Sequence, residues 1–210
     1  MVTETSFAQT RAAMVESQLR TSDVSDTRVI AAMAAVPREA FVPADKAAMA
    51  YTDRPVRLAG GRALNPPLAV GRLLTEAGVQ PGNKVLLIGA ATGYTAAVLT
   101  KIGAIVTAIE EDAALPSPGM EGFVIAPLTV GAPEGGPYDV ILIDGAVDEI
   151  PAALIDQLAE GGRLATGIVD RGVTRLCVGR KAGGSFGLAR LADLEMVILP
   201  GFAQPAGFVF

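Results

Sequence analysis

The sequence predicts an α/β fold built on a mostly parallel β-sheet, and three observations support this prediction. From Lys84 onward, short apolar runs typical of buried strands alternate with helical stretches. Glycines and other turn residues separate these runs. Half of the 210 residues are hydrophobic, and the mean hydropathy is +0.43. A chain of this size and composition has enough apolar material for one full core.

The first part of the chain is expected to be helical. Pro37 ends one of these helices, because the residue before a proline avoids the α conformation. Ser25 is the candidate cap at the other end of that helix. Gly78 is expected to close the helix that begins at two prolines. The expected helices are Phe7 to Leu19, Asp26 to Ala35 and Pro66-Pro67 to Ala77, with a loop from Pro43 to Asn65.

The remainder predicts strands that alternate with helices and a late hairpin. The division is therefore a helical N-terminal extension, residues 1–80, and an α/β core, residues 84–210, within a single domain 1–210. The expected strands are Val85 to Ile88, Ile105 to Ile109, Phe123 to Ala126, Val140 to Ile143 and Arg163 to Ile168, with an antiparallel pair Thr174 to Arg180 and Leu194 to Leu199. The expected helices are Tyr94 to Ile102 and Ile150 to Ala159. The apolar tail from Met196 to Phe210 is expected to fold back onto the body, with a partner-binding tail as the alternative.

Composition excludes several functions. The net charge of −5 and the absence of a basic run argue against a nucleic-acid partner. A chain without histidine has no imidazole for catalysis or for metal binding, and no metal is expected. The single cysteine, Cys177, cannot form an intrachain disulfide and is expected in the core. No segment reads as a signal peptide or a membrane span, so we expect a soluble cytoplasmic protein with no membrane partner.

A candidate ligand site follows the first predicted strand of the core. Gly89, Ala90, Ala91 and Gly93 form a short glycine turn that leads into a helix. Glu110 ends the next strand, where a carboxylate would accept hydrogen bonds from ribose hydroxyls. The glycine spacing is neither that of NAD enzymes nor that of the phosphate loop, which favours a nucleoside ligand without a pyrophosphate. The alternative is that both glycines only allow close packing of helix on strand.

A set of short segments spread over most of the chain matches one known family. These segments are Met14–Arg20, Arg28–Met33, Val36–Pro43, Ala50–Asp53, Ile88–Tyr94, Ala96–Leu99, Ile150-Pro151, Gln157-Leu158 and Gly161–Leu164. From about Met14 to Phe202 the chain thereby resembles the protein-L-isoaspartate O-methyltransferases. The N-terminal helical block is particular to that family among methyltransferases.

This resemblance implies a Rossmann-like, seven-stranded class I methyltransferase fold with S-adenosylmethionine as methyl donor. It implies methyl transfer to the α-carboxyl group of L-isoaspartyl residues in proteins or peptides, which starts the repair of damaged proteins. A carboxylate is already ionised at neutral pH, so this reaction requires orientation rather than a general base.

Several site residues differ from the family pattern. Asn65 stands where the family has a serine that positions the substrate, and it is the candidate catalytic residue. Leu87 replaces the acid expected to pair with the charged methionine end of the cofactor, and Ala91 replaces a glycine. Asp144 is a candidate substitute carboxylate, with a turn-forming aspartate as the alternative. Arg62 could pair with an acidic substrate, although a solvated loop charge is the simpler interpretation.

Two functions therefore stay open. The chain is either a divergent carboxyl methyltransferase or a non-catalytic relative that keeps the fold to bind a partner. The first is favoured, because losing one carboxylate opposite an amine weakens binding by roughly tenfold to a hundredfold without abolishing it.

Overall fold

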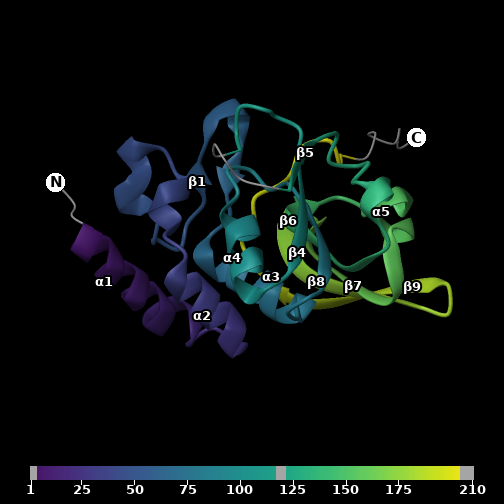
Figure 1. The fold of residues 1–210 in the computed structure, drawn as a ribbon, viewed down its shortest axis with the longest axis horizontal. Helices are drawn as coiled ribbons and strands as arrows, with labels where there is room; N and C mark the ends of the chain where they lie inside the picture. Colours follow the sequence, from purple (N-terminus) through teal and green to yellow (C-terminus); the bar gives the residue numbers. More distant parts are fainter. Residues whose placement is uncertain (1–3, 117–121, 204–210) are drawn as a thin grey trace.

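The computed structural model describes residues 4–116 and 122–203, and its centre is a seven-stranded sheet (Figure 1). The strand order is β5-β4-β3-β6-β7-β8-β9, and the first five of these strands run parallel while β8 is antiparallel to both of its neighbours. The predicted parallel sheet with an antiparallel edge is confirmed. The strands are β3 Lys84–Ile88, β4 Ile105–Glu110, β5 Phe123–Ile125, β6 Tyr138–Val147, β7 Leu158–Asp170, β8 Val173–Ala182 and β9 Ser185–Asp193.

The helices begin and end largely where prolines and glycines predicted. Gly78 and Gly103 adopt the left-handed conformation that closes the helices before them, with φ of 64° and 100°. Asp26, rather than Ser25, caps the second helix, because its carboxylate accepts a hydrogen bond from the Arg28 amide. The helices are α1 Glu4–Met14, continued by the π-helical turn Val15–Leu19, α2 Thr27–Ala35, α3 Pro67–Ala77, α4 Tyr94–Ile102 and α5 Ala152–Asp156.

The expected loop between the N-terminal helices and α3 contains structure of its own. A small antiparallel pair, β1 Val56–Arg57 and β2 Ala63–Leu64, forms a hairpin whose turn is Ala59–Gly61. Two further 3₁₀ turns, Arg38–Phe41 and Ala44–Met49, precede it. This hairpin matters for the site because Arg62 and Asn65 flank β2.

Two sequence predictions at the C-terminal edge are wrong. The expected helix to Ala159 ends at Asp156, and β7 already begins at Leu158. The second strand of the terminal pair is β9, because the chain turns back immediately at Gly183-Gly184, where both φ values are positive. Leu194–Leu199 instead forms an extended segment that runs back across the sheet, where Ile198 makes a parallel bridge to Ala146 of β6.

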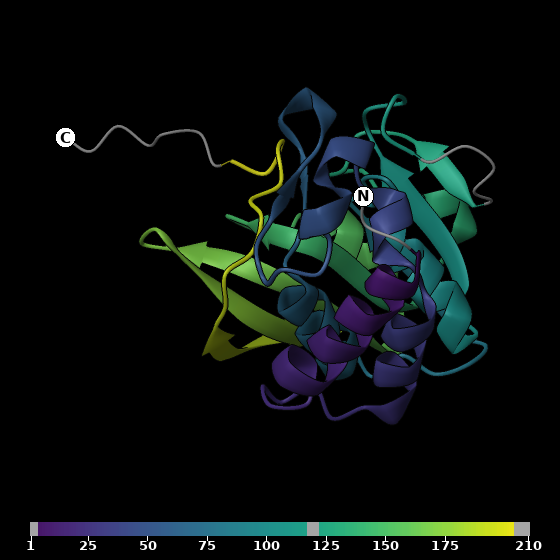
Figure 2. The same ribbon diagram turned by 90° about the vertical axis from the view of Figure 1, so that its left-hand side faces the viewer.

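This returning stretch, Met196–Phe202, is called the C-terminal segment below. It rises beside the hairpin of β1 and β2, where the yellow and dark blue parts of the chain meet in Figure 2. Met196, Leu199 and Phe202 are buried, so residues 196–203 fold back onto the body as expected. The rest of the expected tail, residues 204–210, lies outside the described residues.

Alternating residues of the central strand β3 divide the core between the two faces of the sheet. Val85 and Leu87 join a cluster with α3, α4 and the N-terminal helices, while Leu86 and Ile88 join a second cluster with Leu154 of α5. These four side chains are fully buried, as a parallel strand covered on both faces requires, and only Lys84 at the start of β3 is exposed. Cys177 is free and buried in the second cluster, which confirms its predicted place in the core.

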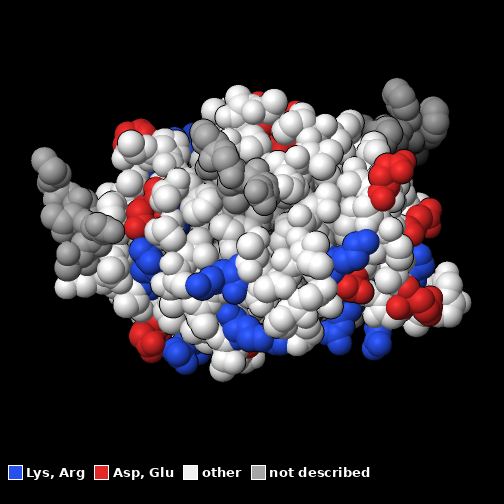
Figure 3. Space-filling view, in the orientation of Figure 1, with Lys and Arg blue, Asp and Glu red and all other residues white. Residues whose placement is uncertain are grey.

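On the face shown in Figure 3, the described residues form no continuous basic area. Lys and Arg side chains there lie mainly along the lower part, interspersed with Asp and Glu, and much of the face is uncharged (Figure 3). Among the described residues, no helix has the length and apolar character needed to span a membrane.

Candidate functional site

The glycine turn after β3 lies against the end of β4. The amides of Gly89 and Ala90 both donate to the Ile109 carbonyl at 3.0 Å, which fixes the turn on the neighbouring strand. Gly89 and Gly93 have φ of 77° and 99°, a conformation that glycine adopts at little cost. Ala91 also has a positive φ, 50°, so the alanine keeps a left-handed backbone at a cost of about 1 kcal/mol.

Glu110 joins this turn through its side chain. Its Oε2 accepts a hydrogen bond from the Ala91 amide at 2.7 Å, and its Oε1 accepts one from the Glu111 amide at 2.9 Å. The side chain is completely buried, whereas Glu111 is exposed. The structure therefore brings together the turn and the acid that the sequence singled out, and only the first acid of the run faces inward.

Arg62 is not a solvated loop charge. Its Nη1 lies 2.5 Å from Glu110 Oε1, and the two side chains are 5% and 0% exposed. Sequence reasoning missed this ion pair because it joins the hairpin to the end of β4 across a large separation along the chain.

The C-terminal segment covers the same turn from another side. A Cβ atom placed on Gly89 would lie 2.8 Å from Leu199 Cδ1 and 3.4 Å from Arg62 Nη2. A Cβ atom on Gly145 of β6 would lie 2.6 Å from Leu199 Cγ. Leu199 is therefore packed tightly against Gly89, directly after β3, and Gly145, inside the adjacent strand β6.

Asp144 stands inside β6 and not in a turn, so its interpretation as a turn-forming aspartate is wrong. Its Oδ1 accepts a hydrogen bond from Asn65 Nδ2 at 2.7 Å, and its Oδ2 accepts one from the Thr95 hydroxyl at 2.5 Å. Burial raises the pKa of the Asp144 carboxyl, and this outweighs the opposing effects of these two hydrogen bonds and of the Arg38 and Arg62 charges. Asp144 is a structural partner of Asn65 in this arrangement.

Both polar atoms of the Asn65 side-chain amide take part in hydrogen bonds. Besides donating to Asp144, its Oδ1 accepts a hydrogen bond from the amide of Val197 at 2.8 Å. The side chain is 2% exposed. The residue predicted to position a substrate therefore connects β6 to the C-terminal segment.

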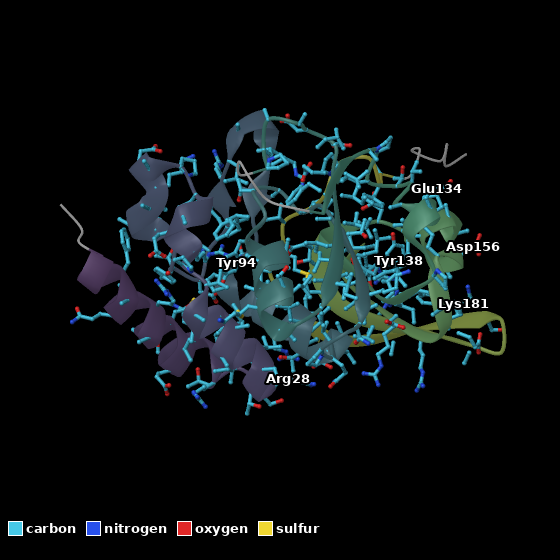
Figure 4. The ribbon with its side chains drawn as sticks, in the orientation of Figure 1. Arg28, Tyr94, Glu134, Tyr138, Asp156 and Lys181 are labelled. Carbon is cyan, nitrogen blue, oxygen red and sulfur yellow. The ribbon has the colours of Figure 1, made fainter. Side chains whose placement is uncertain are left out.

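Arg38 is a buried member of the site that sequence reasoning did not identify. It is 0% exposed, and its Nε and Nη2 donate to the carbonyls of Ala50 and Asn65 at 2.7 and 2.6 Å. The guanidinium also lies over the ring of Tyr94, 4.7 Å from the centroid. Figure 4 shows Tyr94 inside the molecule, between the N-terminal helices and the sheet. Its neighbours Pro37 and Glu39 give no local sign of burial, because the carbonyls that Arg38 contacts belong to other segments of the chain.

The arrangement can be tested against the S-adenosylmethionine that the resemblance implies. Arg62 already pairs with the acid expected to bind ribose, and Leu199 fills the space beside the first glycine. Leu87, in place of an acid, is fully buried in the core. This cofactor therefore does not fit at the turn in the described conformation, because Arg62 holds the acid and Leu199 fills the adjacent space. Within the ranges 4–116 and 122–203, no group of three or more acidic, cysteine or histidine residues could hold a metal ion.

The seven-stranded sheet and the turn–acid pair agree with the class I methyltransferase fold that the resemblance implies. A model of the family "Protein-L-isoaspartate(D-aspartate) O-methyltransferase (PCMT)" matches residues 9–116 and 123–200. The chain belongs to the protein-L-isoaspartate O-methyltransferase family.

Individual relatives agree with this assignment. A protein-L-isoaspartate O-methyltransferase of Koribacter versatilis is 40% identical over 207 residues, which cover 94% of this chain and 93% of the relative. That of Methylorubrum populi is 40% identical over 163 residues, 73% of this chain and 77% of the relative. The similarity therefore extends over the helical N-terminal part as well as the core.

Solved structures show the same fold. One protein-L-isoaspartate O-methyltransferase superposes with a TM-score of 0.77 at 25% identity, and the match covers 91% of this chain and 66% of that one. A Plasmodium falciparum protein, described as a candidate member of the family in complex with S-adenosyl-L-homocysteine, has a TM-score of 0.74 at 22% identity. The match to it covers 90% of this chain and 97% of that chain.

Proposed function

We propose that this chain is an S-adenosylmethionine-dependent carboxyl O-methyltransferase that acts on L-isoaspartyl residues of proteins or peptides. The family assignment over nearly the whole chain supports this activity. The structural observation that carries it is the hydrogen bond between the Ala91 amide and Glu110, which joins the glycine turn to the acid at adjacent strand ends. This is the place in a parallel α/β sheet where ligands bind.

The chemistry suits the side chains that the protein contains. The sequence has no histidine, and a substrate carboxylate needs no general base because it is ionised at neutral pH. The protein has mainly to bind the two reactants in a fixed orientation. In this proposal Arg62 and Leu199 move away from the turn before the cofactor binds.

The proposal gives each candidate residue a role. Gly89, Ala90, Ala91 and Gly93 would approach the cofactor through their backbone, and Glu110 would accept hydrogen bonds from it. Asn65 would contact the substrate carboxylate once it is released from Val197, and Asp144 would orient Asn65. We further propose that residues 1–210 act as one domain in the cytoplasm, where a lone thiol such as Cys177 stays reduced.

A second candidate is a non-catalytic relative that binds a protein partner. The observation in its favour is that Glu110 is paired within the chain while Leu87 occupies the position of the missing acid. Under this candidate the Arg62–Glu110 pair is permanent and part of the structure.

Transfer of a labelled methyl group separates the two candidates. The purified protein is incubated with methyl-labelled S-adenosylmethionine and either an isoaspartyl peptide or the same peptide with normal aspartate. We expect a base-labile methyl ester on the isoaspartyl peptide alone, and a strong reduction by Glu110→Gln but not by Glu111→Gln at the exposed neighbouring position. No ester at millimolar cofactor would reject the enzyme and favour the second candidate.

A further inference from the structure

We propose that Arg62 competes with the cofactor for Glu110 and thereby sets how tightly this enzyme binds its cofactor. This inference rests on the proposed function, since it concerns the same site. It follows from the observation that Arg62 and Leu199 occupy the turn at which the family is expected to bind its cofactor.

The Oε1 atom of Glu110 has no free acceptor position in the described conformation. It receives Arg62 Nη1, the Glu111 amide and, at 3.4 Å, the Asp112 amide, whereas Oε2 receives the Ala91 amide. Each carboxylate oxygen offers about two lone-pair positions, so Oε1 is fully used and Oε2 keeps one. Because the Glu110 side chain is 0% exposed, a ribose hydroxyl could reach it only after a neighbouring group moves, and it could donate to Oε1 only after one of the three donors leaves. The three amides are held by the backbone, so the partner that can leave is Arg62.

Arg62 is incompletely satisfied in its buried position. Its Nε and Nη2 are buried and have no hydrogen-bond partner in the described part of the chain. Buried donors without acceptors are costly, and so is the removal of a guanidinium from water. These costs weaken the pair relative to a fully satisfied one, so a ligand that offers its own donors to Glu110 can displace Arg62.

The turn that precedes Arg62 is built on two glycines. The residue follows Gly60 and Gly61, whose φ values are 60° and 75°. A Cβ atom on Gly61 would meet no atom of the described residues within 4 Å. The Leu58 amide donates to the Arg62 carbonyl and the Arg62 amide donates to the Ala59 carbonyl, so these backbone bonds do not involve the guanidinium that pairs with Glu110.

Calorimetric titration with S-adenosylhomocysteine tests the proposal on the full chain. Arg62→Met removes the charge and keeps most of the volume, and Arg62→Gln keeps one donor for Glu110 in case the first variant does not fold. Arg57→Met is the matched control, because Arg57 is exposed on the same hairpin. The thermal unfolding midpoint of each ligand-free variant is measured alongside the titrations.

We expect Arg62→Met to bind the ligand about tenfold to a hundredfold more tightly than the unsubstituted chain, and Arg62→Gln to fall between them. The same variants should unfold at lower temperature without ligand. This opposite movement of affinity and stability is what competition requires, whereas a residue with only a structural role would lower both. Arg57→Met should change neither quantity.

Two results would overturn the proposal, and they have different consequences. Tight binding by the unsubstituted chain, with equal or weaker binding by both Arg62 variants, would reject competition while leaving the proposed function intact. No binding by the unsubstituted chain or by either folded Arg62 variant would reject competition and S-adenosylmethionine as the cofactor together.

Discussion

Asn65, directly after β2, donates a hydrogen bond from its side-chain Nδ2 to Oδ1 of Asp144 in β6, and the two atoms lie 2.7 Å apart. The carbonyl oxygen of the same amide accepts from Val197 of the C-terminal segment. One buried side chain therefore joins three parts of the chain that are far apart in sequence. Any change at Asn65 must therefore act on this connection, and under the proposed function it would act on substrate binding as well.

Asn65→Ala should lower the free energy of unfolding by about 1–3 kcal/mol, because it leaves one oxygen of Asp144 and the Val197 amide without partners. Urea unfolding followed by circular dichroism measures this loss. Asn83→Ala is a suitable control, since Asn83 Oδ1 accepts a hydrogen bond from the Gln80 amide near the surface. A loss for Asn65→Ala no larger than that for Asn83→Ala would contradict the stabilising role of the Asn65 connection.

Arg38→Met should be more damaging, with a loss of about 3 kcal/mol in the free energy of unfolding. Two hydrogen bonds from a charged donor disappear, and the carbonyls of Ala50 and Asn65 are left unpaired in the interior. The exposed Arg57→Met should stay within about 0.5 kcal/mol of the unsubstituted chain. A comparable small effect at Arg38 in urea unfolding would contradict its role as the buried anchor of this region.

Local patterns in the sequence were sufficient to predict the central part of the fold. The apolar run of β3, the glycine turn after it and Gly103 at the end of α4 each have a local physical cause, and the structure places them as predicted. Leu194–Leu199 shows the limit of such patterns. Its apolar residues suggest a strand. The tight turn at Gly183-Gly184 instead pairs β8 with the residues that directly follow the turn, so β9 takes the place expected for Leu194–Leu199.

The site was less predictable than the fold because its contacts are long-range. Glu110 could be singled out, since it ends a strand beside a glycine turn. The partner of Glu110 could not, because nothing in the sequence near Arg62 shows that the hairpin places this arginine in the interior. Arg38 is similar, since its burial depends on carbonyls of two other segments.

Leu199→Ala should destabilise the protein by about 2–4 kcal/mol, because its side chain is 3% exposed and packs tightly against the Gly89 and Gly145 backbone. The neighbouring Ile198 is 60% exposed and provides a matched control. Ile198→Ala should cost less than about 0.5 kcal/mol. Similar small losses for both variants in urea unfolding would mean that the C-terminal segment is not held on the turn in solution.

Asp144→Asn should make the protein more stable at neutral pH, with an advantage that shrinks as the pH falls. Burial raises the pKa of Asp144 above its ordinary value of 3.8 in spite of the nearby Arg38 and Arg62 charges. Between the ordinary and the raised pKa the folded state binds more protons than the unfolded state. The free energy of unfolding therefore falls as the pH rises through this window and is constant above it.

An asparagine does not ionise, so the variant escapes this loss while its carbonyl can still accept from Asn65. Urea unfolding of both proteins at a series of pH values from 4 to 7.5 measures the difference. The advantage of Asp144→Asn should be absent near pH 4, grow with pH and then level off. A variant less stable than the unsubstituted chain at pH 7.5 would show that the ionised carboxylate, held by Thr95 and Asn65 and facing two arginines, is favourable in its buried position.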